Sequence, residues 1–593
     1  MLYRVKIGLI TFVLLVIFSM MLNADTKAFK IIDDPAMDEA VAEAREKFLK
    51  SHPTVTRLDA AILVLQPDGS WKRGSYNPEN VAYPASTVKL AYLASAMHWC
   101  RTNDQPYDYL NWCVQPMIVN SDNVDTGHVV DAITESQNYP ATEDDEKFEK
   151  WMEKRRYTRR FLEEKGLYEN QTILSKTYPS NSGNMPEGAE KLLIDIYGRN
   201  MMQPKCTASL MLEVAKGGIE PEATDYMRSL LRTDRWSGHS SLGFGLPPGS
   251  VYENKIGVAY DTVEDVAYVV LPNGKEFILA AFSNGFVEPY KNNPYPYNAS
   301  LLGGFCEMLV KRLNLDDGNP PKIRLDAMSP NFSKTGLWSY GSKRPDQHSQ
   351  NFIFKQSGDG NGVASWDLNV PESGWYEVAI WYPQDPLFSA YAPVKIIHLR
   401  GEEIRQLNQT KCGGQWYWLG DYYFQKGAGK VIINDNIAQN TLVAVDSIKI
   451  TKFPEGSYPD YVIDNEAGPP AFMETGSWTY KTGHGYNDKD YKMANSGDAA
   501  SATWNIPLNQ PGSYDLYVLF HSDKDRCKKS KYTIRASDGS HDVFVDQSLN
   551  DRQWIKLGTF QLDQNNGSIT LDASKSSEGK TVVADAIGYT LVK

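Results

Sequence analysis

The chain is poor in the residues that build metal centres and disulfide scaffolds. Its 593 residues include six cysteines and nine histidines, and they contain no Cys-x-x-Cys pair and no Cys/His cluster. A structural zinc ion needs four such ligands at close spacing, so we expect neither a metal nor a cofactor. Cys100 and Cys113 are the best disulfide candidates in an oxidising compartment. Cys206 and Cys306 either pair or remain buried thiols.

Positive charge is also scarce. The formal net charge is -12 and the isoelectric point is about 5.4. Domains that bind nucleic acid carry basic patches, so this balance excludes nucleic acid as an expected partner. The composition is otherwise globular, with 41% hydrophobic residues and 12% aromatic residues. The length predicts three or four domains.

A long apolar run lies near the N-terminus, at residues 7–22, after the basic residues Arg4 and Lys6. This pattern is typical of a secretion signal, with Ala24 as a plausible cleavage end. We therefore predict a signal peptide over residues 1–24 and a secreted or periplasmic protein. A retained membrane anchor is the alternative, although the run is short for a membrane span.

The first of three motifs that suggest one catalytic site is Ser-Thr-Val-Lys at residues 86–89. Pro84 and a helix-forming apolar run flank it, so Ser86 is expected in the first turn of a helix with Lys89 on the same face. A lysine kept neutral by burial or by a second cation can take the proton of an attacking serine hydroxyl. The spacing alone is weak, because Ser577 and Lys580 repeat it near the C-terminus.

The other two motifs are Ser-Asp-Asn at residues 121–123 and Lys-Ile-Gly at residues 255–257. The second of these lies in a segment, residues 246–282, whose pattern predicts adjacent antiparallel strands with a tight turn. There Lys255 would supply a positive charge for a carboxylate, and Gly257 would let a substrate approach the backbone.

Taken in this order, the three motifs resemble the S-x-x-K, S-D-N and K-T-G boxes of class A β-lactamase-like, penicillin-binding serine hydrolases. The resemblance covers residues 30–315. It implies an α/β (α+β) domain of the β-lactamase/transpeptidase type, with the site between an antiparallel sheet and a helical subdomain. It implies the following roles: Ser86 as nucleophile, Lys89 as base, Ser121 and Asn123 as positioning and proton-shuttling groups, Lys255 as substrate clamp, and the N–H of Val258 as an oxyanion donor beside that of Ser86.

Two departures from the family pattern concern deacylation and substrate binding. The Glu-x-x-Leu-Asn motif that activates the deacylating water in class A β-lactamases is missing. Glu187 is the candidate by spacing from Pro204, and Glu190 fits half of the motif; the alternative for both is a solvated loop. Ile256 replaces the hydroxyl residue of the third box, so we predict weak or absent turnover of ordinary penicillins.

A charged insert, residues 143–165, is predicted to form an exposed amphipathic helix without a chemical role. It contains Phe148, Trp151 and Phe161 among many Lys, Arg and Glu residues.

The C-terminal half contains two copies of one unit, at residues 322–455 and 460–593, offset by 138 to 140 positions. For example, Ala-Ser-Trp at residues 364–366 returns as Ala-Thr-Trp at residues 502–504. Short alternating runs split by Gly, Pro, Asn and Asp predict two tandem all-β sandwich (jelly-roll) domains. The units resemble golvesin and xanthan-lyase C-terminal domains, which are carbohydrate-binding-like. Tryptophans that recur in both copies fill a core or stack on sugars, whereas Trp418 differs between the copies.

The sequence therefore predicts a secreted, multidomain serine hydrolase that forms an acyl-enzyme at Ser86 and hydrolyses a β-lactam or a related amide. The first alternative is a cell-wall D-alanyl peptidase, transpeptidase or esterase on the same fold. The second is a non-catalytic glycan-binding wall protein, although such a protein has no reason to keep all five polar residues of the site. The expected partners are a small-molecule or peptidoglycan-derived substrate and a cell-wall or polysaccharide glycan.

Overall fold

The computed structural model describes residues 29–142, 146–177, 186–285, 300, 302–317, 322–437, 440–564 and 567–592. The predicted signal segment, residues 1–24, lies outside this part of the chain. Of the helices in the described ranges, none is both long and apolar enough to span a membrane.

A six-stranded sheet forms the centre of the N-terminal unit. Its strand order is β1-β3-β2-β6-β5-β4, so β4 is an edge strand. Neighbouring strands are antiparallel except for β1 and β3. The strands are β1 (Ile31–Asp33), β2 (Arg57–Leu65), β3 (Trp71–Tyr76), β4 (Val251–Ala259), β5 (Thr262–Val270) and β6 (Glu276–Asn284).

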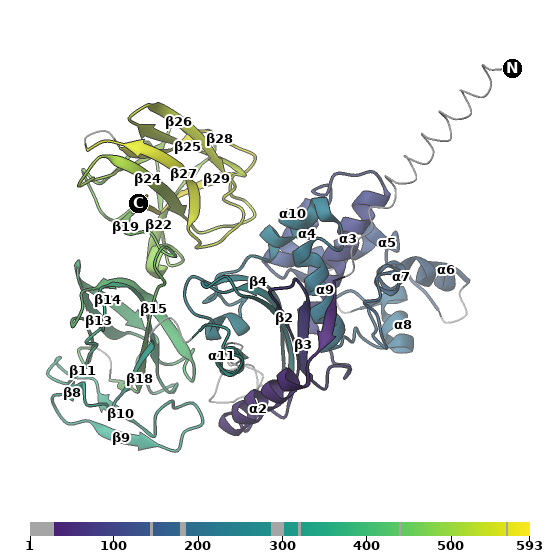
Figure 1. Ribbon diagram of the computed structural model, residues 1–593, viewed down its shortest axis with the longest axis horizontal. Helices are drawn as coiled ribbons and strands as arrows, with labels where there is room; N and C mark the ends of the chain where they lie inside the picture. Colours follow the sequence, from purple (N-terminus) through teal and green to yellow (C-terminus); the bar gives the residue numbers. More distant parts are fainter. Residues whose placement is uncertain are drawn as a thin grey trace.

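Helices cover both faces of this sheet (Figure 1). Successive side chains of a strand point to opposite faces. Ala60 and Ile62 accordingly pack with α2 and α11, whereas Ala61 and Leu63 join the larger helical core on the other face. The helices are α2 (Pro35–Ser51), α3 (Lys89–Thr102), α4 (Asn111–Val119), α5 (Asn123–Thr134), α6 (Glu146–Arg155), α7 (Tyr157–Glu164), α8 (Gly188–Tyr197), α9 (Pro204–Lys216), α10 (Thr224–Leu231) and α11 (Leu302–Arg312).

The charged insert forms two helices, α6 and α7, rather than one. Phe148, Trp151 and Phe161 are buried, so its amphipathic character is confirmed. Its polar side is not wholly exposed, because Arg155 is only 1% exposed. The insert is therefore fixed to the helical subdomain by a buried cation as well as by aromatic rings.

The C-terminal half repeats one all-β topology. In the first copy the sheets have the orders β15-β12-β18-β7, β14-β13-β16-β11-β8 and β17-β10-β9, and in the second copy β27-β24-β30-β19, β26-β25-β28-β23-β20 and β29-β22-β21. Both copies carry a bulge at the same place, between Val378 and Ala379 and between Leu516 and Tyr517. Equivalent bulges in equivalent strands show that the duplicated sequence folds twice in the same way.

The strands of these two units have the following bounds. The first unit contains β7 (Lys322–Asp326), β8 (Phe332–Lys334), β9 (Ser339–Ser342), β10 (Asn351–Gln356), β11 (Val363–Asp367), β12 (Gly374–Trp381), β13 (Ala392–His398), β14 (Gly401–Leu407), β15 (Trp416–Phe424), β16 (Lys430–Asn434), β17 (Leu442–Val445) and β18 (Ser447–Lys452). The second contains β19 (Tyr461–Asp464), β20 (Phe472–Thr475), β21 (Thr479–Thr482), β22 (Asp490–Asn495), β23 (Ser501–Asn505), β24 (Gly512–Leu519), β25 (Lys529–Ala536), β26 (Gly539–Val545), β27 (Ile555–Leu562), β28 (Ser568–Ser577), β29 (Thr581–Ala584) and β30 (Ala586–Leu591).

The tryptophans of the two copies divide between core and interface. Trp366 and Trp504 occupy the same position in the two copies and are 0% and 1% exposed, so they are core residues. Trp418 and Trp554 are half-buried instead, and they lie where the units of the molecule meet.

Both all-β units pack against the N-terminal unit (Figure 1). Arg235 forms a buried ion pair with Glu377 of the first copy. Asp234 pairs with Arg552 of the second copy at 2.7 Å. These contacts, at adjacent positions of one loop, hold all three units together.

The expected disulfide between Cys100 and Cys113 is wrong for this structure, in which all six cysteines are free thiols. Cys100 and Cys113 are buried residues of α3 and α4, and burial raises the pKa of each thiol, to about 11 and about 12. Cys206 and Cys306 are buried in helices on opposite faces of the sheet, so they remain thiols as one alternative proposed.

Candidate active site

The Ser86 turn is held against the edge strand of the sheet. Ser86 is half-buried in a short 3₁₀ turn, η1 (Ala85–Val88), that leads into α3. Ala85 at the start of this turn has a backbone φ of 45°, a value that residues other than glycine rarely adopt. The Thr87 hydroxyl donates to the Lys255 carbonyl at 3.3 Å. The first and third sequence motifs are thus adjacent in space.

Gly257 makes this approach possible. A Cβ atom at this position would lie 2.3 Å from the Pro84 carbonyl oxygen and 2.8 Å from the Thr87 nitrogen. No side chain fits there without moving the turn that carries Ser86. The sequence analysis predicts that Gly257 lets a substrate approach the backbone. The structure shows that the turn carrying Ser86 also packs closely against this glycine.

Lys89 connects the first motif to the second. Its side chain is fully buried, and its Nζ donates to Asn123 Oδ1 at 2.8 Å, to Ser121 Oγ at 3.2 Å and to the Ser121 carbonyl. Burial, and then the charge of Lys255, hold the pKa of Lys89 well below its usual range. A neutral amine at this position has the electron pair that a base needs.

Lys255 lies on the other side of the same hydroxyl. Its Nζ donates to Ser121 Oγ at 2.9 Å and to the Ile256 carbonyl at 3.1 Å. Burial lowers the pKa of Lys255 to about 7, although the charge of Asp265 opposes this shift. The positive charge predicted for Lys255 therefore depends on pH near neutrality.

A buried carboxylate supports β4 from the neighbouring strand. Asp265 lies opposite Ile256 in the β4–β5 pair. Its oxygens accept hydrogen bonds from Tyr252 at 2.6 Å and Asn254 at 2.9 Å, and from two backbone N–H groups. Sequence reasoning missed Asp265, because a carboxylate inside an apolar strand shows its partners only after folding.

The Ser86 hydroxyl forms no hydrogen bond with any described residue, including Lys89. Bonds between a nucleophile and its base often tighten only when substrate binds. Val258 is 41% exposed on the edge strand directly after Gly257. Its backbone therefore continues β4 directly beyond the contact between Gly257 and the Ser86 turn.

The two candidate glutamates have different surroundings. Glu187 is exposed and precedes the first turn of α8. Glu190 is 1% exposed and pairs with Arg155 at 3.0 Å. Neither contacts Lys89, Ser121 or Asn123 within the described ranges. The stretch before Glu187, residues 178–185, is outside them.

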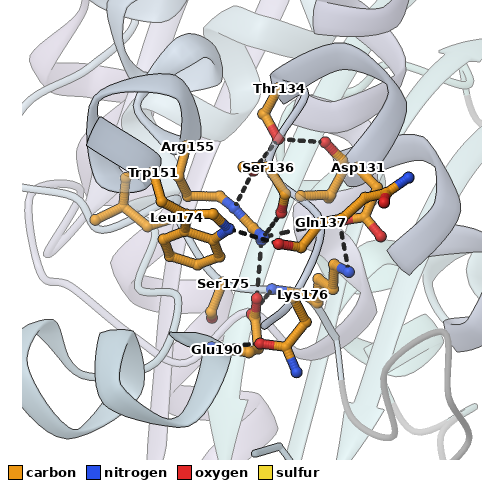
Figure 2. A network of polar contacts seen from close by, with 12 residues as sticks. Asp131, Thr134, Ser136, Gln137, Trp151, Arg155, Leu174, Ser175, Lys176 and Glu190 are labelled. Carbon is orange, nitrogen blue, oxygen red and sulfur yellow. Dashed lines mark hydrogen bonds and ion pairs between the residues drawn. The ribbon is translucent and has the colours of Figure 1, made fainter. Parts of the chain in front are cut away.

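Glu190 belongs to the buried polar network of Figure 2. One of its oxygens accepts the backbone N–H of Lys176 at 2.7 Å, and the Lys176 amine pairs with Asp131 at 2.6 Å. Arg155 donates to Ser136 and lies over the Trp151 ring. Since Asp131 lies on α5, the helix that begins at Asn123, the network anchors the helix that carries the second motif.

Comparison with known proteins assigns the chain to a family. Residues 323–452 and 461–591 each match the Golvesin C-terminal domain, and residues 108–299 match the Beta-lactamase enzyme family. The protein named golvesin from Dictyostelium discoideum is 31% identical over 472 residues, which are 76% of this chain and 80% of that protein. The chain belongs to the golvesin family. It combines a Beta-lactamase family domain with two Golvesin C-terminal domains, as the sequence predicted.

Other similar proteins match smaller parts of this golvesin-family chain. Xanthan lyase from Bacillus sp. (strain GL1) is 28% identical over 142 residues, covering 23% of this chain and 15% of the lyase. A β-lactamase from Sphaerobacter thermophilus is 16% identical with a TM-score of 0.34, covering 48% of this chain and 98% of that chain. The protein named PBP-A is 18% identical with a TM-score of 0.32, covering 46% and 96%. The Beta-lactamase match includes Ser121, Asn123 and Lys255 and begins after Lys89.

Proposed function

We propose that this golvesin-family protein is a serine hydrolase that forms an acyl-enzyme at Ser86 with a β-lactam or a related amide. The observation that carries the proposal is the buried Lys89 amine. It contacts Ser121 and Asn123, has a lowered pKa, and begins the helix directly after the Ser86 turn.

The proposed acylation uses these groups in order. Neutral Lys89 accepts the proton of Ser86 as its oxygen attacks the substrate carbonyl. The N–H groups of Ser86 and Val258 stabilise the developing oxyanion. The hydroxyl of Ser121 lies between the Lys89 and Lys255 amines, and it passes a proton to the departing nitrogen while Lys255 binds the substrate carboxylate.

Deacylation requires a water activated by a base, and Glu187 is our candidate for that base. Its carboxyl is exposed directly before α8, and its spacing from Pro204 is the one that the family resemblance assigns to this base. Glu190 is a less suitable base, because Arg155 and Lys176 already occupy its oxygens.

The test is to incubate the protein and its Ser86→Ala variant with a labelled penicillin and to follow both adduct and product. Rapid product formation lost in the variant supports a β-lactamase. A long-lived adduct on Ser86 supports a D-alanyl peptidase or transpeptidase. If neither adduct nor product forms, the same experiment is repeated with aryl esters and a D-alanyl-D-alanine peptide; failure with all of these refutes the hydrolase proposal.

We also propose that the Golvesin C-terminal domains bind a cell-wall or polysaccharide glycan. The similarity to xanthan lyase, a protein named for a polysaccharide, supports this proposal, as do half-buried aromatic residues such as Trp418. Co-sedimentation of the full chain with peptidoglycan and with insoluble polysaccharides tests it. Recovery of all the protein in the soluble fraction in every case contradicts it.

Secretion or export to the periplasm completes the proposal, supported by the basic start and apolar run of the N-terminal segment. N-terminal sequencing of exported protein is expected to begin near Asp25. A retained Met1 would support an anchor instead.

A further inference from the structure

A cavity of about 220 Å³ lies where the three units meet. Trp236 of the hydrolase-like domain, Trp418 and Asp421 of the first Golvesin C-terminal domain, and Tyr486 and Trp554 of the second contribute to its lining. None of the eight proposed site residues lines it. The cavity is therefore separate from the Ser86 site, although strand β4 contributes residues to both.

Three tryptophans in this lining are partly exposed although they lie between domains. Trp236, Trp418 and Trp554 are each half-buried. In a repeat-to-repeat comparison, Trp418 corresponds to Lys556, so this ring is not needed to build the fold. An accessible aromatic ring in a polar cavity offers an apolar face beside hydrogen-bonding groups, as small-molecule sites do.

Two acidic side chains face each other beside these rings. Glu377 and Asp421 are directly opposite in the β12–β15 pair, an arrangement that is destabilising when both are charged. Burial and the charge of Glu377 hold the pKa of Asp421 well above its usual range. In the second copy the equivalent positions hold Asp515 and Thr559. The paired carboxyls are thus particular to the domain junction.

The other charges of the cavity compensate one another. Glu377 accepts hydrogen bonds from Arg235 and from Trp236 Nε1, the latter at 2.7 Å. Arg552 pairs with Asp234 at 2.7 Å. The lining therefore favours a neutral ligand with hydroxyl groups, which a neutral carboxyl can both donate to and accept from. Gln553 adds a buried Nε2 without a partner among the described residues.

The volume limits the size of this ligand. Sites for drug-sized molecules have roughly 300–1,000 Å³, and about 220 Å³ is smaller. We propose that the cavity binds one neutral sugar residue, with its ring against Trp418 and its hydroxyl groups bonded to Asp421 and Gln553. This inference rests on the proposed glycan binding by the C-terminal domains, and it identifies the cavity as the binding site.

The test is titration of the full-length protein with N-acetylglucosamine, glucose and mannose, followed by tryptophan fluorescence. At least one sugar is expected to give a saturable change. Trp418→Ala is expected to weaken its binding about tenfold or more, as truncation of a central aromatic residue does. Tyr391→Ala is the matched control, because Tyr391 belongs to the same domain, is 58% exposed and does not line the cavity.

A second variant, Asp421→Ala, guards against misfolding of the first. It removes one of two opposed carboxyls without adding any atom to the cavity, so we expect it to fold, and it is expected to lose binding to the same extent. The cavity assignment is overturned if no sugar gives a saturable change, or if both variants bind as the wild type does. In either case, retained co-sedimentation with a polysaccharide leaves the broader glycan-binding proposal standing.

Discussion

The Lys255 amine lies 2.9 Å from the Ser121 hydroxyl, inside the protein. Lys89 approaches the same oxygen at 3.2 Å. Two amines that are this close and this buried cannot both hold a full charge without a large cost in free energy. The geometry therefore links the proposed base to the proposed clamp, because the charge of Lys255 helps to keep Lys89 neutral.

Binding of an anionic substrate is predicted to weaken as pH rises through 7. The pKa of Lys255 is about 7, so the amine is charged below this pH and neutral above it. KM of the wild type should therefore rise between pH 7 and pH 9. In Lys255→Arg the side chain stays charged over this range, so KM should stay constant. The measurement is KM against pH for a carboxylate substrate. An identical rise in both proteins would show that Lys255 does not bind the anion.

Ile256→Thr is predicted to raise the rate of acylation by penicillins roughly tenfold or more, because it restores a hydroxyl that can bond a buried carboxylate. Ile256 is 5% exposed, directly after Lys255. Ile256→Val is the control, since valine has the shape of threonine without the hydroxyl. Adduct formation with labelled penicillin measures the rate. Equal acylation rates in the Thr and Val variants would show that the assignment of residues 255–257 as the third motif is wrong.

Gly257→Ala is predicted to reduce acylation at Ser86 by about a hundredfold and to destabilise the fold by about 1–3 kcal/mol, the usual effect of overpacking. The added carbon would lie 2.3 Å from the Pro84 carbonyl oxygen. Gly304→Ala is a matched control, because its new carbon would meet nothing closer than Phe48 at 3.8 Å. Chemical denaturation and adduct formation report the two effects. Unchanged acylation in Gly257→Ala would exclude a tight contact between the turn and β4.

Glu190→Gln and Glu187→Gln are predicted to act differently. The first leaves Arg155 without its closest charged partner and is expected to cost about 3–5 kcal/mol of unfolding free energy. The second changes an exposed residue and is expected to leave stability unchanged while lengthening the lifetime of the acyl-enzyme. Denaturation curves and adduct decay distinguish them. A normal decay rate in Glu187→Gln would remove it from the deacylation step.

The sequence alone indicated the hydrolase-like domain, the duplication and the motifs carrying Lys89, Ser121 and Lys255. These signals are local in character: a helix start, a polar turn, a strand and a repeated pattern each depend on neighbouring residues. It also placed Ser86 at the start of α3, although that start is a 3₁₀ turn and not an α-helical one.

Contacts between distant segments had no such local signal. Asp265 supports β4 from the next strand. Arg155 reaches Glu190 from an insert whose sequence pattern predicts only an exposed amphipathic helix. Cys100 and Cys113 were near in sequence but remain free thiols. In each case burial decides which groups meet, and burial is a property of the packed chain.

The sequence by itself determined which chemical groups this protein carries and in what order. The tertiary structure decided their state: Lys89 and Lys255 share one hydroxyl, and their common burial lowers both pKa values. It also brought Trp236, Trp418 and Trp554 from three domains to one cavity. The physical reason is the same for both, since desolvation and domain packing depend on surroundings that residues distant in sequence create.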